Sequence, residues 1–313
     1  MDLVVHLAAP AAPAESIRAA NQGTWYALDI ARRCDAQFVL ASTAHVYGAA
    51  CGHRLREIDV DPMKPTDAGP IGLDQTRAAY DSARFAEALT MAYRKAFHTD
   101  TVILRVFDTY GPAMATVDAR VVPTHIRQAL AGEALTVTGD GHQVRSLCYV
   151  EDTVRAIVTM GASLHPGPIS VDSPDEISIR HLAEQVLRLT GSSAGIRFVD
   201  RQPEDPEARC PEVSQAHALL GWKPRVELAD GLERTVHSCV ADRLLQEAAA
   251  CASSAPYPRV PRRPPPHQPS RSRAGPRPRL GRRAHWRPRR SRASGAAHHP
   301  AAPRAPGRSG RTA

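Results

Sequence analysis

The feature that most constrains the fold is the apolar run L-V-V-H-L-A-A at Leu3–Ala9. Such a run is typical of a strand that is covered on both faces inside a parallel sheet. A strand of this kind needs neighbouring strands and helices above and below it. Only two residues precede the run. We therefore expect an incomplete sheet, in which the strands that would stand before this one are absent.

Strand-like and helix-like segments alternate through the first third of the chain. We expect strands at Leu3–Ala8, Gln37–Ser42 and Thr101–Phe107, and helices at Glu15–Cys34 and Tyr80–Phe97. This alternation predicts an α/β fold with a parallel sheet and right-handed crossovers, of the Rossmann type. We assign it to residues 1–112.

The regular alternation of strands and helices ends after Pro112, where the expected strands are shorter and the helices more numerous. We expect helices at Asp118–Ala131, Glu151–Met160, Ser178–Thr190, Gln215–Leu220 and Leu228–Val240, and strands at Leu135–Val137, Arg145–Tyr149, Pro168–Val171 and Ile196–Val199. Residues 113–240 are therefore predicted to form mainly a small α+β lobe.

The basic character of the chain comes from its end. Residues 241–313 hold 17 arginines, no lysine and two acidic residues, against 23 basic and 30 acidic residues before them. This Arg- and Pro-rich tail has too few apolar residues for a core, and we expect it to be disordered. It could bind nucleic acid non-specifically, be a solvated extension, or be the product of a shifted reading frame. The body is acidic, so nucleic acid is not an expected partner of the body.

The cysteines and the apolar runs limit the cellular setting. Six scattered cysteines without a C-x-x-C pair predict neither a metal site nor a disulfide framework. No apolar run is long enough to cross a bilayer. We expect a cytoplasmic protein with reduced thiols and no membrane contact.

Four local patterns carry residues suited to chemistry. Two stand at the ends of expected parallel strands, where ligands of open α/β sheets bind: Ser42–Gly48 (S-T-A-H-V-Y-G) and Arg105–Pro112 (R-V-F-D-T-Y-G-P). Tyr80 and Arg84 stand one helical turn apart, so that a cation lies on the same face as a phenol and lowers its pKa. Finally, the segment Gly139–Ser146 (G-D-G-H-Q-V-R-S) predicts a turn that leads into a strand, and that strand carries an arginine.

Together with longer stretches, these patterns resemble the extended short-chain dehydrogenase/reductase superfamily, and within it the UDP-glucuronate decarboxylases. H-L-A-A-P-A-A-P at His6–Pro13 is similar to that group's H-L-A-C-P-A-S-P, and A-E-A-L-T-M-A-Y at Ala86–Tyr93 to its A-E-T-L-T-M-D-Y. Leu135–Ser146, Asp205–Arg209 and Ala218–Trp222 also match its motifs. The resemblance covers Met1 to about Val240 and leaves out the tail.

The resemblance implies an NAD-dependent enzyme that converts UDP-glucuronate to UDP-xylose and CO2, with a UDP-sugar as partner and a homodimeric state. It implies that Tyr80 is the catalytic base, that Thr43 holds the sugar oxygen and that Arg84 takes the place of the catalytic lysine. The implied cofactor contacts are His6, Ala8, Ser42, Tyr80 and Arg84, and the implied substrate contacts are Asp108, Arg120, Arg145 and Arg209.

The chain also departs from that group. The G-x-x-G-x-x-G turn that holds the NAD diphosphate is not in the sequence, Arg84 replaces a lysine, and Thr43-Ala44-His45 replaces T-S-E. Asp108 stands where the group has asparagine and adds a negative charge beside a diphosphate. His45 could act as a replacement acid, although a tolerated surface histidine is the simpler interpretation.

Three functions follow from this pattern. The first is a UDP-glucuronate decarboxylase. The second is a non-catalytic remnant that retains at most nucleotide-sugar binding, and the third is another epimerase or dehydratase of a nucleotide sugar. The Thr43-Ala44-His45 triplet does not decide between them.

Overall fold

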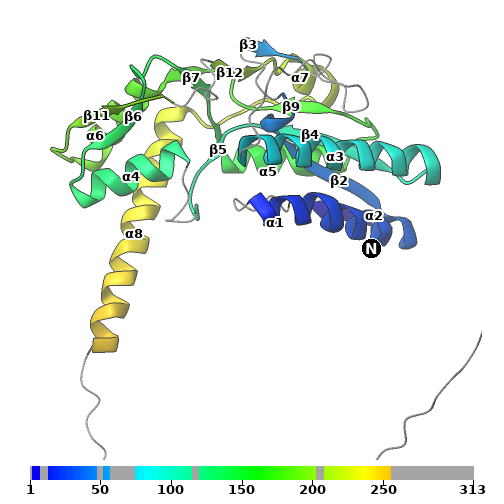
Figure 1. Cartoon of the computed structure of the whole chain (residues 1–313), viewed down its shortest axis with the longest axis horizontal. Helices are drawn as coiled ribbons and strands as arrows, with labels where there is room; N and C mark the ends of the chain where they lie inside the picture. The colour runs from blue at the N-terminus through cyan, green and yellow to red at the C-terminus, as the bar shows by residue number, and fades with distance from the viewer. Residues whose placement is uncertain are drawn as a thin grey trace, which may run out of the picture. The chain divides into compact units, whose positions relative to one another are not determined.

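A four-stranded parallel sheet, which we call sheet A, is the centre of the fold in the computed structural model (Figure 1). The structure describes residues 2–7, 13–47, 52–56, 75–114, 120–201 and 208–254. These lie in one compact unit, Met1–Pro256, and the second unit, Tyr257–Ala313, lies outside the described residues.

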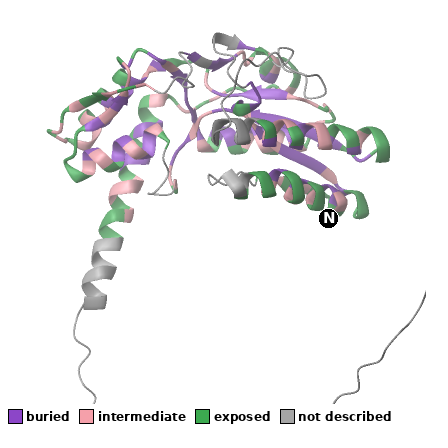
Figure 2. Cartoon of the chain, viewed as in Figure 1, coloured by how far each residue is buried: buried purple, intermediate pink, exposed green. Residues whose placement is uncertain are grey.

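Sheet A has the strand order β1-β2-β4-β9. Its strands are β1 (Leu3–His6), β2 (Gln37–Thr43), β4 (Thr101–Val106) and β9 (Ile169–Val171). β2 and β4 read as apolar runs because both of their faces are covered, and Figure 2 shows buried residues along them. β1 pairs with β2 alone among the described strands, and Leu3 and Val5 are each more than one third exposed.

Helices cover both faces of sheet A. On one face lie α1 (Pro13–Arg18), a short π-helix η1 (Ala19–Gly23), α2 (Thr24–Arg33) and α3 (Gln75–Phe97). The alternation of side chains directs Phe38 and Leu40 toward α2 and α3, and directs Val39 toward the opposite face. That opposite face is covered by α5 (Val150–Gly161) and by Trp222, which follows α7 (Ser214–Leu220).

A second group of elements forms a lobe beside the sheet. Its core lies between α4 (Val121–Ala131), α6 (Ile179–Thr190), the first turns of α8 (Leu228–Ser254) and the parallel pair β6 (Leu135–Thr138) and β11 (Ile196–Val199). α6 begins where the Ser178 hydroxyl accepts from the backbone N–H of His181, and it ends at Gly191 with φ 63°. These are the expected signals of a helix start and stop.

The remaining strands join the two groups. A mixed sheet has the order β10-β7-β12-β3, with β10 (Glu176–Ser178), β7 (Val144–Ser146), β12 (Ala208–Pro211) and β3 (Gly52–Leu55). A short parallel pair joins β5 (Thr109–Tyr110) to β8 (Cys148–Tyr149), and a 3-10 turn, η2 (Ala44–Tyr47), follows β2.

The α/β class and the parallel sheet are as predicted, whereas several boundaries differ. The strand expected at Arg145–Tyr149 is divided at the buried Leu147 into β7 and β8, which join different sheets. α8 continues to Ser254, so the first part of the segment that we expected to be disordered is helical; the rest of that tail lies outside the described residues. The boundary at residue 112 stays a prediction, and β9 and α5, which follow it, belong to sheet A and its cover.

No helix in the described part of the chain is long and apolar enough to span a membrane. Within the same residues, no three His, Cys, Asp or Glu side chains gather as a metal site.

Candidate functional site

The carboxyl ends of three strands of sheet A lie side by side and bring several predicted residues to one edge. The register pairs Thr43 with Val106 and Val106 with Val171. Asp108 follows β4 by two residues, and Asp172 follows β9 directly. This edge is where ligands bind in open parallel sheets.

Thr43 stands at the end of β2 with His45 as its neighbour. The Thr43 Oγ1 lies 2.9 Å from the His45 Nδ1, and the backbone N–H of His45 donates to the same oxygen at 3.4 Å. His45 is exposed. The hydroxyl that the sequence predicts to hold a sugar oxygen therefore lies within hydrogen-bond distance of a titratable ring.

Ser42, predicted to contact the cofactor, belongs to a buried ionic cluster. Its hydroxyl donates to Glu87 Oε1 at 2.6 Å. Glu87 also accepts two hydrogen bonds from Arg105, at 3.0 Å from Nε and 2.8 Å from Nη2, and both side chains are fully buried. The guanidinium extends the cluster to the phenol of Tyr47, which lies 3.1 Å from the Ser170 hydroxyl. The cluster thus links β2, β4, β9, η2 and α3.

The helix that carries Tyr80 is held by this cluster. Glu87 lies on α3 two turns after Tyr80, about 10 Å along the helix axis, and one turn after Arg84. α3 also packs against η2, next to Thr43. For Tyr80 the structure describes the backbone only, and Arg84 is partly buried.

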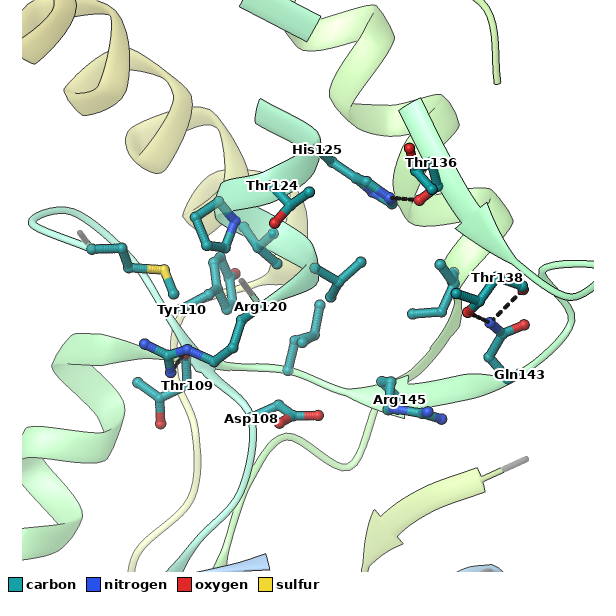
Figure 3. A pocket seen from close by; sticks show the side chains of 16 residues that line it. Asp108, Thr109, Tyr110, Arg120, Thr124, His125, Thr136, Thr138, Gln143 and Arg145 are labelled. Atoms are coloured by element: carbon teal, nitrogen blue, oxygen red, sulfur yellow. Dashed lines mark hydrogen bonds between the residues drawn. The ribbon is translucent and has the colours of Figure 1, made fainter. Parts of the chain in front are cut away.

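A pocket of about 340 Å³ lies where the lobe meets the strand ends (Figure 3). It contains three of the four predicted substrate residues. Arg120 donates from Nη1 to the Thr109 carbonyl at 3.2 Å. Arg145 is buried, and its Nη1 donates to the Val144 carbonyl at 2.7 Å. The lining residues are Asp108, Thr109, Tyr110, Met114, Arg120, Val121, Val122, Pro123, Thr124, His125, Thr136, Thr138, Gln143, Arg145, Leu147 and Ile179.

The fourth predicted substrate residue, Arg209, is a neighbour of Arg145 in the backbone register. β12 pairs with β7 in parallel, with Arg209 opposite Arg145. The side chain of Arg209 lies outside the described residues. These two arginines stand 64 positions apart in the sequence, and the fold places their backbones on adjacent strands.

His6 and Ala8 were predicted to lie near the cofactor. His6 stands at the end of β1, and its Nε2 lies 3.1 Å from the Thr24 Oγ1. Burial lowers the pKa of His6, so its ring is neutral at neutral pH. Ala8 lies outside the described residues.

Asp172 was not predicted from the sequence. It is fully buried, its Oδ1 accepts from the backbone N–H of Ser173 at 2.8 Å, and its Oδ2 has no hydrogen-bond partner. Burial raises the pKa of Asp172, and the charge of Asp108 raises that pKa further. A lone aspartate after an apolar strand gives no signal of its burial.

His125, Thr136 and Gln143 were also missed. His125 reads as an interior position of an amphipathic helix, and the spacing does not reveal that its ring lies against β6. Its Nε2 donates to the Thr136 carbonyl at 3.1 Å, while Gln143 donates from Nε2 to the carbonyl and the hydroxyl of Thr138. Both polar side chains line the pocket and are at most 4% exposed.

The comparisons with known proteins assign the family. Residues 1–171 match the NAD dependent epimerase/dehydratase family, and the chain belongs to that family. UDP-glucuronic acid decarboxylase 3 of Arabidopsis thaliana is 38% identical over 240 residues, which are 74% of this chain and 68% of the relative. UDP-glucuronic acid decarboxylase 1 of Xenopus tropicalis is 36% identical over 245 residues, which are 76% of this chain and 56% of the relative. The chain thus spans between about half and two thirds of the relatives it matches.

Solved structures of the same family have the same fold. The UDP-glucuronic acid 4-epimerase of Bacillus cereus, in complex with NAD, matches with a TM-score of 0.65 and 28% identity, covering 77% of this chain and 75% of that one. The epimerase Mth375 of Methanothermobacter thermautotrophicus matches with a TM-score of 0.71 and 25% identity, covering 79% and 74%.

The family relation raises the question of whether this chain's own residues fit NAD. The Ser42 hydroxyl is bonded to Glu87, and the His6 ring to Thr24. The sequence holds no G-x-x-G-x-x-G turn, whose backbone N–H groups would receive the diphosphate of the dinucleotide. The residues that the structure describes therefore do not by themselves fit a complete NAD site.

Proposed function

We propose that this chain binds a UDP-sugar in the pocket around Arg120 and Arg145, and that its ligand is UDP-glucuronate. The pocket supports this proposal, because it combines two arginines with a volume typical of small-molecule sites. The decarboxylase names of the relatives at 36–38% identity support the choice of UDP-glucuronate.

The charges of the pocket suit a diphosphate. Guanidinium groups form charge-assisted, often bidentate hydrogen bonds to phosphate oxygens. Arg145 has only 8% of its surface exposed, so a bond from it to an anion would be only weakly screened by solvent. Asp108 opposes the anion, and the arginines must outweigh that repulsion. The sugar would then extend toward the strand ends, where Thr43 and the Tyr80 segment of α3 lie.

The reaction that we propose is decarboxylation of UDP-glucuronate to UDP-xylose and CO2. It needs the NAD of the family, whose site the described residues do not complete by themselves. Thr43 would hold a sugar hydroxyl, and Tyr80 would take its proton. Arg84, one turn further along α3, would favour the ionised phenol. The pocket supports the choice of ligand, and the family relation supports the choice of reaction.

Turnover tests the reaction directly. The full chain is incubated with UDP-glucuronate and NAD, and CO2 and UDP-xylose are measured, with Tyr80→Phe as the control variant. We expect product with the wild type and a loss of more than 100-fold with Tyr80→Phe. A folded wild type that binds UDP-glucuronate and forms no product would contradict the reaction.

That outcome would favour a second function, nucleotide-sugar binding without catalysis. One observation supports this second candidate: among the described residues, the polar atoms of the predicted cofactor contacts Ser42 and His6 are occupied by protein partners. A thermal shift with UDP-sugar and none with NAD is its expected signature.

A further inference from the structure

The wall of the pocket formed by α4 and β6 differs in chemistry from the wall that holds the arginines. In Figure 3, Asp108, Arg120 and Arg145 lie along one side, while His125 and Thr136 lie across from them. The arginine side can bind an anion. The opposite side is uncharged, with His125 buried and Thr136 partly buried, so it suits the part of a ligand that carries no charge.

The hydrogen bond to Thr136 fixes the tautomer of His125. A carbonyl oxygen can only accept, so Nε2 of His125 must carry the hydrogen in its 3.1 Å contact with the Thr136 carbonyl. Burial lowers the pKa of His125, which keeps the ring neutral at neutral pH. A neutral imidazole with its hydrogen on Nε2 has a bare lone pair on Nδ1. Nδ1 is therefore a hydrogen-bond acceptor.

That acceptor has no partner in the protein. His125 is 1% exposed, and its Nδ1 is a buried atom without a hydrogen bond. A buried polar atom left unpaired destabilises the fold, and one explanation for such an atom in a native structure is a partner from outside the chain. His125 lines the pocket, so a bound ligand can supply the donor, provided that it displaces the protein atoms that cover Nδ1.

We propose that His125 is a specificity-determining residue whose Nδ1 accepts a hydrogen bond from the imide N3–H of a uracil base. This inference rests on the proposed function, which places a UDP-sugar in the pocket. Uracil carries a hydrogen on N3 at neutral pH, whereas the N3 of cytosine is itself an acceptor. Two acceptors facing each other cannot bond, and the cytosine base would leave both unpaired.

The test compares two nucleotides that differ only in the base. Binding of UDP and of CDP to the full chain is measured by isothermal titration calorimetry at pH 7.5. We expect the wild type to bind UDP about tenfold or more tightly than CDP, because the mismatched base loses one hydrogen bond. Equal affinities for UDP and CDP would overturn the inference.

Two variants separate a ligand contact from a structural role. His125→Gln can keep the bond to the Thr136 carbonyl, because its amide reaches the place of Nε2, but it removes the Nδ1 acceptor. His125→Asn offers an oxygen near the place of Nδ1 and loses the Thr136 bond. We expect the preference for UDP to vanish in His125→Gln and to survive in His125→Asn, with thermal unfolding curves to show that both are folded. An unchanged preference in His125→Gln would overturn the assignment.

The outcome also separates this inference from the proposed function. A wild type that binds neither nucleotide contradicts the UDP-sugar assignment, and the inference falls with it. A wild type that binds both nucleotides equally well retains the nucleotide pocket and contradicts only the role of His125.

Discussion

Glu87 and Arg105 form a fully buried ion pair, and each charge depends on its partner for compensation. Both side chains have no exposed surface, and they share two hydrogen bonds. Burial alone would lower the pKa of Arg105, but the hydrogen bonds and the charge of Glu87 raise it above its ordinary value. Removing one partner leaves a buried charge without compensation.

We expect Glu87→Gln to lower the free energy of unfolding by about 3–5 kcal/mol. Urea denaturation followed by circular dichroism measures this change. The matched control is Asp100→Asn, which removes the exposed partner of Arg94 and should cost less than about 1 kcal/mol. Similar losses for the two variants would show that the buried pair is no more important than a surface pair.

The cysteines should differ sharply in reactivity. Cys34 is exposed, whereas Cys148 and Cys210 are buried, and burial raises the pKa of Cys148 to about 12 and of Cys210 to about 11. Thiolates are the reactive form. At pH 8 we expect iodoacetamide to label Cys34 and to leave Cys148 and Cys210 unlabelled until urea unfolds the chain. Peptide mapping reads each site, and early labelling of Cys148 would contradict the packing of β8.

At the scale of elements, the contact between α4 and β6 depends on a neutral histidine. Burial lowers the pKa of His125 below its ordinary 6.5, so the unfolded chain binds a proton at this position more readily than the folded chain. The contribution of His125 to the free energy of unfolding is therefore fully present above pH 6.5. That contribution decreases as the pH falls below 6.5 toward the lower pKa of the folded state.

The prediction is a difference between two stability curves. We expect the free energy of unfolding of the wild type, measured between pH 7.5 and 5, to fall more steeply than that of His125→Phe, which has nothing to protonate at this position. Parallel curves would mean that His125 is not held neutral by the fold.

The start of α8 is packed tightly against β5 and β8. A Cβ added at Gly231 would collide with the Tyr110 hydroxyl and would crowd the Tyr149 ring. Gly231→Ala should therefore cost about 1–3 kcal/mol, although alanine favours helix elsewhere. Gly195→Ala, where a Cβ meets nothing within 4 Å, is the control and should be close to neutral in the same denaturation experiment.

Hydrophobic periodicity predicts most helices and strands. It fails for the short strands that form only because they pair with segments distant in sequence. The buried strands β2 and β4 can be recognised in the sequence as apolar runs, and α6 has capping residues at both of its ends. β3, β5, β10 and β12 are two to four residues long, and their pairing partners lie far away in sequence. No local pattern distinguishes them from loops.

The candidate site was predictable to the extent that its residues lie in family motifs. Asp108, Arg120 and Arg145 were named from the sequence, and the fold gathers them around one pocket. His125 and Asp172 depend on burial and on partners across the fold, which the sequence does not display. Motifs identify side chains that bind charge, whereas orphaned polar atoms become visible only in three dimensions.

At the scale of the whole molecule, α2 and α3 expose several large apolar side chains. Trp25, Tyr26 and Ile30 on α2 and Phe85 and Phe97 on α3 are each between 45% and 58% exposed, and the two helices lie on the same face of sheet A. Exposed apolar surface of this kind marks association sites. We expect a homodimer by light scattering, and a shift toward monomer in Tyr26→Lys. A monomeric wild type would contradict this.

The pocket between the lobe and the strand ends should bind a UDP-sugar through its arginines. Isothermal titration of the full chain with UDP-glucuronate, in the wild type and in Arg145→Ala, measures this binding. We expect saturable binding to the wild type and an affinity at least about tenfold weaker in the variant, because a charge-assisted bond to the diphosphate is lost. No binding to a folded wild type, or equal affinities in the two proteins, would contradict it.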